Sequence, residues 1–116
     1  MKTDRAYVFD ILNAAKVIEG IIQERTFEQF IGDTERYYAC LYKLIVMGEA
    51  TKRLSEETRQ RFPGIDWRGL AGLRDVVAHQ YDGIDDEYLW GTLTKRVPGL
   101  IGQLASILEN WVEPGD

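Results

Sequence analysis

The feature that most constrains the fold is the stretch 34–54, whose centre reads YYACLYKLIVMG. On a helix, this segment is apolar around most of its circumference, and such a helix is buried on more than one side. In a chain of 116 residues, one side can face the chain's own core and another a partner subunit. A single carboxylate, Glu49, lies within this apolar body.

The remainder of the chain also predicts helices, because apolar residues recur at three- and four-residue spacing and strand-like alternation is absent. The expected helices span 4–24, 34–54, a short stretch after Ser55, 67–79 and 85–111. Polar residues that can cap them precede them: Thr3, Asp33 or Thr34, Ser55 and Asp66. Pro98 falls inside the last helix and should kink or divide it. We predict one all-α domain over 1–116, an up-down bundle of four main helices plus short helices.

The composition excludes several classes of site and of protein. Cys40 is the only cysteine and His79 the only histidine, so an internal disulfide and a zinc site of the usual kind are both excluded. The longest apolar runs, such as LIVM at 44–47, are too short to span a bilayer, and the charged N-terminus does not suit a signal peptide. We therefore expect a soluble, cytoplasmic protein with no metal and no cofactor.

Charge is unevenly distributed along the chain. The net charge of −5 argues weakly against a nucleic-acid-binding protein. Residues 51–74 carry six basic and three acidic side chains, whereas residues 75–116 carry two basic and eight acidic ones. The positive segment leads directly into RDVVAHQY at 74–81. The excess of positive charge in residues 51–74 would also be explained if these basic residues lie on the solvated faces of two helices.

Arg74 is the anomalous residue of RDVVAHQY. On a wheel drawn over 67–81, it falls inside the apolar arc between Leu70 and Ala78, with Tyr81 about 20° from it and His79 about 140° away. A guanidinium on an apolar face needs a partner or a ligand. Three explanations stay open: an ion pair with Glu49, a phosphate contact, or extension to the surface near the helix end.

His79 and Tyr81 also have simple structural explanations. A histidine near a helix C-terminus interacts favourably with the helix dipole, and a tyrosine there is typical of the edge of a core. Together with Arg74, however, they suit RNA cleavage without a metal. Histidine can transfer protons near neutral pH, arginine can hold phosphate oxygens in a bidentate fork, and a dimer would bring two copies together.

The spacing R-x4-H-x-Y, formed by Arg74, His79 and Tyr81, resembles the signature of the HEPN superfamily and specifically its HepT-like toxin branch. The likeness extends over 47–85: Gly-Glu-Ala at 48–50, the Pro63 turn, Trp67, the motif, and a Tyr-x-Gly-apolar-Asp turn. Asp75 follows Arg74, where the superfamily tends to have a polar residue.

The resemblance implies a homodimeric bundle with the two motifs facing each other, and a metal-independent endoribonuclease in a type VII-like toxin–antitoxin pair. Arg74 and His79 would be catalytic. Asp75, at the polar position after Arg74, and Glu49, the carboxylate that can pair with Arg74, are assigned as supporting residues. The partner would be a small MNT-type nucleotidyltransferase, which in some members transfers AMP to the residue at the position of Tyr81. The alternative is a catalytically silent helical dimer that serves as a binding module for such a nucleotidyltransferase.

From the residues we make two further predictions. The dimer interface should include the helices at 34–54 and 67–81 and bury on the order of 2,000 Å² in total. Arg74 should be buried or half-buried near the dimer axis and paired with Glu49, so that Glu49→Ala should cost roughly 3 kcal/mol or more.

Overall fold

The computed structural model describes residues 2–83 and 85–113, apart from the side chain of Tyr81. Within these residues all regular secondary structure is helical and there are no strands, which confirms the all-α prediction. The elements, in chain order, are α1 (Asp4–Ile22), α2 (Phe27–Ile31), α3 (Thr34–Lys52), α4 (Glu56–Arg61), α5 (Trp67–Ala71), α6 (Leu73–Tyr81), α7 (Asp86–Gly91), the π-helical turn η1 (Thr92–Arg96) and α8 (Val97–Glu109). Every one of these helices is too short or too polar to span a lipid bilayer.

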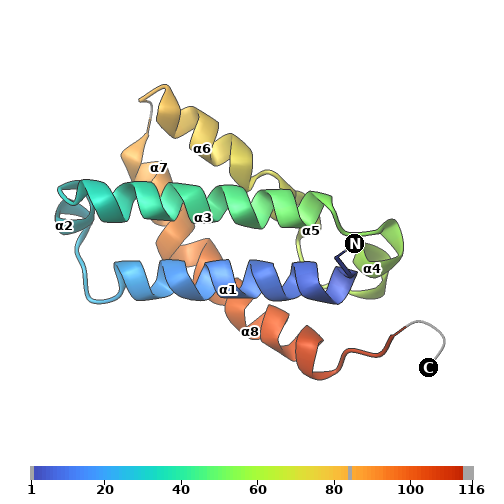
Figure 1. Ribbon diagram of the computed structural model, residues 1–116. Helices are drawn as coiled ribbons and strands as arrows, with labels where there is room; N and C mark the ends of the chain where they lie inside the picture. The colour runs from blue at the N-terminus through green and yellow to red at the C-terminus, as the bar shows by residue number, and fades with distance from the viewer. Residues whose placement is uncertain (1, 84, 114–116) are drawn as a thin grey trace.

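The two longest helices, α1 and α3, lie side by side along most of the molecule (Figure 1). Thr3 caps α1 by accepting a hydrogen bond from the backbone N–H of Ala6, and Asp33 caps α3 by accepting from that of Arg36. Both caps satisfy N–H groups that a helix start leaves unpaired. Their facing apolar stripes form the centre of the core.

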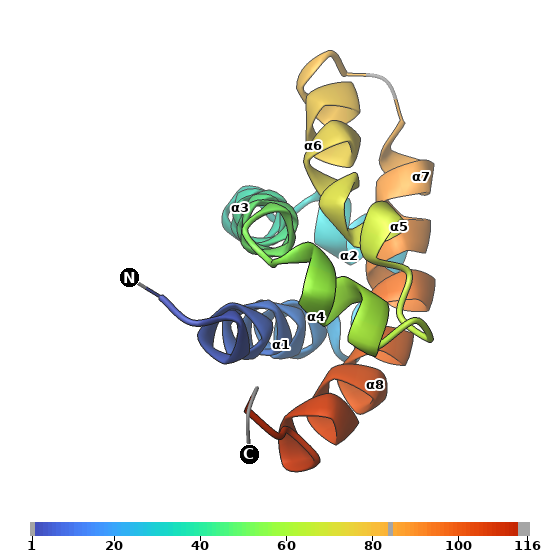
Figure 2. The ribbon, with the colours of Figure 1, turned by 90° about the vertical axis from the view of Figure 1, so that its right-hand side faces the viewer.

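α3 is covered on more than one side by its own chain. α1 packs against one side and the α5–α6 segment against another (Figure 2). At Gly48 the backbones approach so closely that an added Cβ would lie 3.2 Å from the N atom of Arg74. The apolar circumference of α3 is therefore largely used within the monomer, although Tyr38 and Tyr42 remain more than 60% exposed.

The predicted helix at 67–79 is two helices. α5 ends at Ala71 and α6 starts at Leu73, with Gly72 between them in a tight turn. The N–H of Asp75 bonds to the Gly72 carbonyl at 2.9 Å, a turn-type contact between residues three apart. Because the helix is interrupted at Gly72, one wheel does not describe the residues of α5 and α6 together.

The C-terminal region is divided as Pro98 predicted. Pro98 lies in the first turn of α8, where its missing N–H costs little. η1 precedes it, and the N–H of Val97 bonds to the Thr92 carbonyl five residues earlier. α8 ends at Glu109 rather than at Trp111.

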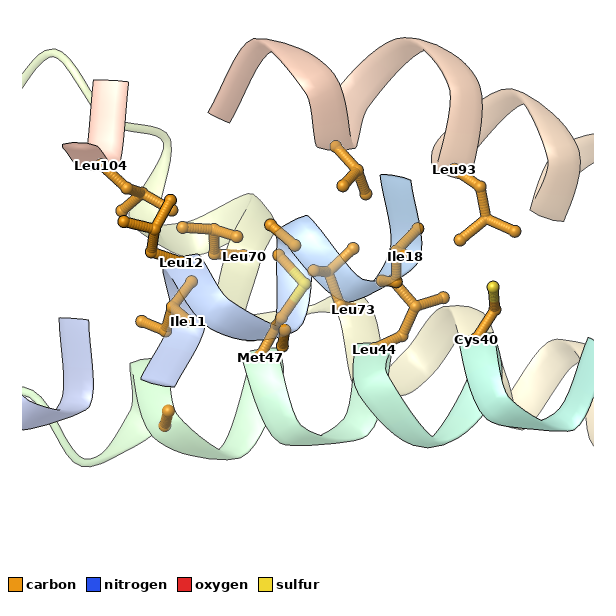
Figure 3. Packing of buried hydrophobic residues seen from close by; sticks show 14 of the residues in the cluster. Ile11, Leu12, Ile18, Cys40, Leu44, Met47, Leu70, Leu73, Leu93 and Leu104 are labelled. Carbon is orange, nitrogen blue, oxygen red and sulfur yellow. The ribbon is translucent and has the colours of Figure 1, made fainter. Parts of the chain in front are cut away.

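The core is continuous across these elements (Figure 3). Side chains from α1, α3, α5, α6, η1 and α8 meet there: Ile11, Leu12, Ile18, Cys40, Leu44, Met47, Leu70, Leu73, Leu93 and Leu104. Burial raises the pKa of the Cys40 thiol to about 12, so this cysteine is a protonated core residue and not a nucleophile.

Candidate functional site

α6 carries the whole motif and presents its residues on different faces. Leu73, Val76 and Gln80 are buried toward the core, whereas Arg74 and His79 are exposed. Their positions follow from the helical repeat, which separates residues 74 and 79 by about 140°. Tyr81 is the last residue of α6, and its side chain lies outside the part of the chain that the structure describes.

Arg74 pairs with Glu49 of α3, as the sequence predicted. Its Nη1 donates a hydrogen bond to Glu49 Oε1 at 2.9 Å. The expected burial is not found in the single chain, where the Arg74 side chain is 60% exposed and that of Glu49 40%. The apolar arc assigned to Arg74 came from treating 67–81 as one helix, and the break at Gly72 removes Leu70 from that arc.

His79 opens onto a groove between α5, α6 and α7, which lie on one side of the molecule (Figure 2). The groove measures about 510 Å³. Its lining residues are Gly69, Gly72, Asp75, Val76, His79, Asp85, Tyr88 and Arg96. Asp75 and His79 lie one helical turn apart on this face, and Arg74 is not among the lining residues. One chain by itself therefore does not bring Arg74 and His79 into the same groove.

A second, more apolar groove of about 460 Å³ lies between α3 and α6. It is lined by Tyr37, Tyr38, Leu41, Tyr42, Ile45, Val77 and Gln80. Tyr38, Tyr42, Ile45 and Glu49 follow one another along α3 at helical spacing, so the Arg74–Glu49 pair continues this surface along the two helices. We call it the α3/α6 face.

Gln80 anchors the C-terminal end of the motif helix, and sequence reasoning missed it. Its buried Nε2 donates to Tyr37 Oη at 3.1 Å and to Asp86 Oδ1 at 2.9 Å. The Tyr37 hydroxyl also donates to Asp86 Oδ1, at 2.9 Å. Burial, together with the Asp86 carboxylate, raises the pKa of Tyr37, so the hydroxyl keeps its proton. The spacing of Gln80 from Leu73 and Val76, seven and four residues, was a usable signal that it faces the core.

No three His, Cys, Asp or Glu side chains of the described ranges gather where they could hold a metal ion. Apart from His79, the charged side chains that line the groove are Asp75, Asp85 and Arg96.

Comparison with known proteins adds the deciding observation. A family model described as "Ribonuclease HepT-like" matches residues 11–107, which is most of the chain. The chain belongs to the HepT-like ribonuclease family. The matched residues include the whole motif helix, Glu49 and the groove in front of His79. This family assignment confirms the resemblance found in the sequence.

HepT-like relatives cover nearly the full chain. "Putative RNase MJ0127" of Methanocaldococcus jannaschii is 35% identical over 109 residues, which are 94% of this chain and 90% of that protein. "Probable ribonuclease HepT" of Thermococcus cleftensis is 32% identical, over 91% of this chain and 96% of that protein. "Putative RNase TTE0752" of Caldanaerobacter subterraneus is 33% identical, over 94% and 97%. No solved structure matches this chain.

Proposed function

We propose that this chain is a metal-independent endoribonuclease in which His79 transfers protons and Arg74 stabilises phosphate charge. The observation that carries the proposal is an exposed histidine at an open groove in a member of a ribonuclease family. Histidine is the side chain whose proton affinity suits both removal of the 2′-hydroxyl proton and protonation of the leaving oxygen.

The Arg74–Glu49 pair is compatible with a phosphate contact. A guanidinium has five N–H donors, and among the described residues the Arg74 side chain donates only from Nη1, to Glu49. In the single chain the Arg74 side chain is 60% exposed, so its remaining donors are available to phosphate oxygens. Glu49 would then hold the guanidinium in place, and Asp75 would support His79 from the neighbouring turn.

We propose further that two chains assemble through the α3/α6 face. Tyr38 and Tyr42 give this face an exposed aromatic surface beside an apolar groove, and self-complementary surfaces of this kind pair about a two-fold axis. A dimer would supply two histidines and two arginines, so that residues of both chains could complete the combination. One chain, which separates Arg74 from the His79 groove, lacks this combination.

Regulation is the third part of the proposal. An MNT-type nucleotidyltransferase would act as the antitoxin in the cytoplasm and transfer AMP to Tyr81. A bulky anion at the end of α6 would repel an incoming RNA backbone. The test is intact-mass spectrometry after incubation with the cognate transferase and ATP. Wild type should gain whole AMP units and Tyr81→Phe none; an unchanged gain in Tyr81→Phe would place the modification elsewhere.

The activity itself is tested by RNA degradation with purified wild type, His79→Ala and Arg74→Ala, with Lys16→Ala on the exposed face of α1 as the matched control. We expect loss of cleavage in the first two variants, retained cleavage in the control, and similar thermal melts for all. Cleavage that persists in His79→Ala would refute the assignment of His79.

The silent binding module remains the second candidate, because the single chain holds Arg74 and His79 on different faces. Under that alternative, wild type leaves RNA intact but still forms a complex with the nucleotidyltransferase. The same degradation assay, read beside a binding assay, separates the two candidates.

A further inference from the structure

The groove in front of His79 has a cation of its own. Arg96, the last residue of η1, lines it together with His79, and it is the only lysine or arginine among the lining residues. Its Nη2 donates to the Gly69 carbonyl at 3.3 Å, a long bond that leaves most of its donors unused. Arg96 is exposed and makes no ion pair within 4 Å to any described residue.

The position of Arg96 depends on a glycine. A Cβ at Gly69 would lie 2.2 Å from Asp66 Oδ2 and 3.1 Å from Nη2 of Arg96. Asp66 cannot simply move away, because its other oxygen caps α5 by accepting from the Gly69 N–H at 2.9 Å. Gly69 therefore leaves the space in which the guanidinium of Arg96 lies beside α5.

The π-helical turn also places Arg96. A π turn inserts an extra residue into the helical repeat and rotates the residues on either side of it relative to each other. Here it lies between α7, which carries Tyr88, and α8. Tyr88 lines the same groove and is 49% exposed. Its backbone is fixed by Asp85, whose Oδ1 accepts from the Tyr88 N–H at 2.9 Å.

The groove combines an exposed aromatic ring, a guanidinium with free donors and a histidine. Side chains of this kind are typical of sites that bind single-stranded nucleic acid. Bases stack on aromatic rings, and arginine holds the phosphate between them. Asp75 and Asp85 add negative charge to the groove, which disfavours a run of phosphates. The groove therefore suits one nucleotide unit and not a long stretch of backbone.

We propose that this groove is the subsite for one nucleotide of single-stranded RNA next to the scissile bond, with its base on Tyr88 and its phosphate on Arg96. This inference rests on the proposed ribonuclease function. It makes Arg96 and Tyr88 binding residues on the His79 side of α6, separate from Arg74.

The experiment measures the affinity of the full-length protein for a short, uncleavable 2′-O-methyl RNA at several salt concentrations. Arg96→Ala should weaken binding at low salt, and the slope of log affinity against log salt should fall by about 0.7, the value for one phosphate contact on a single strand. Tyr88→Leu should weaken binding by about tenfold, from the loss of one stacked base, with the slope unchanged. Tyr88→Phe should keep the affinity because it keeps the ring.

Lys95→Ala is the matched control. Lys95 is the exposed neighbour of Arg96 on η1 and does not line the groove, so its removal should change neither affinity nor slope. Equal losses for Lys95→Ala and Arg96→Ala would show a diffuse charge effect and overturn the subsite.

RNA cleavage by the same proteins distinguishes failure of the subsite from failure of the ribonuclease proposal. If wild type cleaves RNA while Arg96→Ala and Tyr88→Leu bind as wild type does, the subsite is wrong and the ribonuclease proposal stands. If wild type neither binds nor cleaves, both fall. Thermal melts of each variant establish that the folded state is retained.

Discussion

Substituting Glu49 by alanine tests the Arg74–Glu49 pair and the proposed dimer together. In the single chain the two side chains are 40% and 60% exposed, and solvent-exposed pairs contribute about 0.2–1 kcal/mol to stability. For a chain of 116 residues, 1 kcal/mol corresponds to a shift in melting temperature of about 4 °C. Glu49→Ala should therefore lower the melting temperature of the dilute monomer by no more than about 4 °C, well below the 3 kcal/mol expected for a buried pair.

The dimer should respond differently. If pairing through the α3/α6 face buries the Arg74–Glu49 pair, Glu49→Ala leaves an unpaired guanidinium in the interface, at a cost of about 3–5 kcal/mol. Each 1.4 kcal/mol is a factor of ten in a dissociation constant. The dimer dissociation constant should therefore rise by at least about a hundredfold.

Sedimentation equilibrium over a range of protein concentrations measures the dimer dissociation constant. Thermal melts at high and low protein concentration measure how far the substitution destabilises the monomer. Glu19→Ala, an exposed carboxylate on α1, is the control and should change neither. An unchanged dissociation constant in Glu49→Ala would refute burial of the pair at the interface. A loss of several kcal/mol in the unfolding free energy of the dilute monomer would refute the claim that the solvent-exposed pair contributes little to its stability.

Two further substitutions test the fold around the site. Asp4→Ala removes the carboxylate that accepts hydrogen bonds from the Ser55 N–H and from the Ser55 and Thr58 hydroxyls, and chemical denaturation should show a loss of about 1–2 kcal/mol. Burial alone would raise the pKa of Asp4, but these hydrogen bonds outweigh it and leave the pKa below its ordinary value. The difference in unfolding free energy between wild type and Asp4→Ala should therefore be complete above the unfolded-state pKa of about 3.9. It should vanish as the pH falls through the lowered folded-state pKa. Gly48→Val should destabilise the fold by about 2 kcal/mol or more, since even its Cβ would meet the Arg74 backbone at 3.2 Å, and a melting temperature equal to that of wild type would contradict this close contact.

Local signals in the sequence were enough to predict the helical fold. The caps at Thr3, Ser55 and Asp66 and the division at Pro98 are set by residues next to one another in the chain, and all four appear in the structure. The pairing of Arg74 with Glu49 was also predicted, because Arg74 falls among apolar residues on the wheel and Glu49 is the one carboxylate within the apolar centre of the 34–54 helix.

The errors arose where tertiary structure overrides periodicity. The wheel over 67–81 gave Arg74 a buried position because it did not allow for the break at Gly72, although glycines at 69 and 72 were a warning. The groove of His79 was not predicted either. This groove forms only because α7 and η1 fold back beside α6. No sequence signal between Asp86 and Arg96 predicts the π-helical turn.

The shortness of α6 has a consequence for how the motif is maintained. At nine residues, α6 is below the length at which an isolated helix is stable in water. Its helical form therefore depends on docking, at one end through the close contact with Gly48 and at the other through Gln80, Tyr37 and Asp86. Local opening that releases the Gln80 end would unwind the segment carrying His79 while α1 and α3 stay folded. In hydrogen exchange, the amides of α6 should therefore open as a separate unit of lower free energy than those of the two long helices.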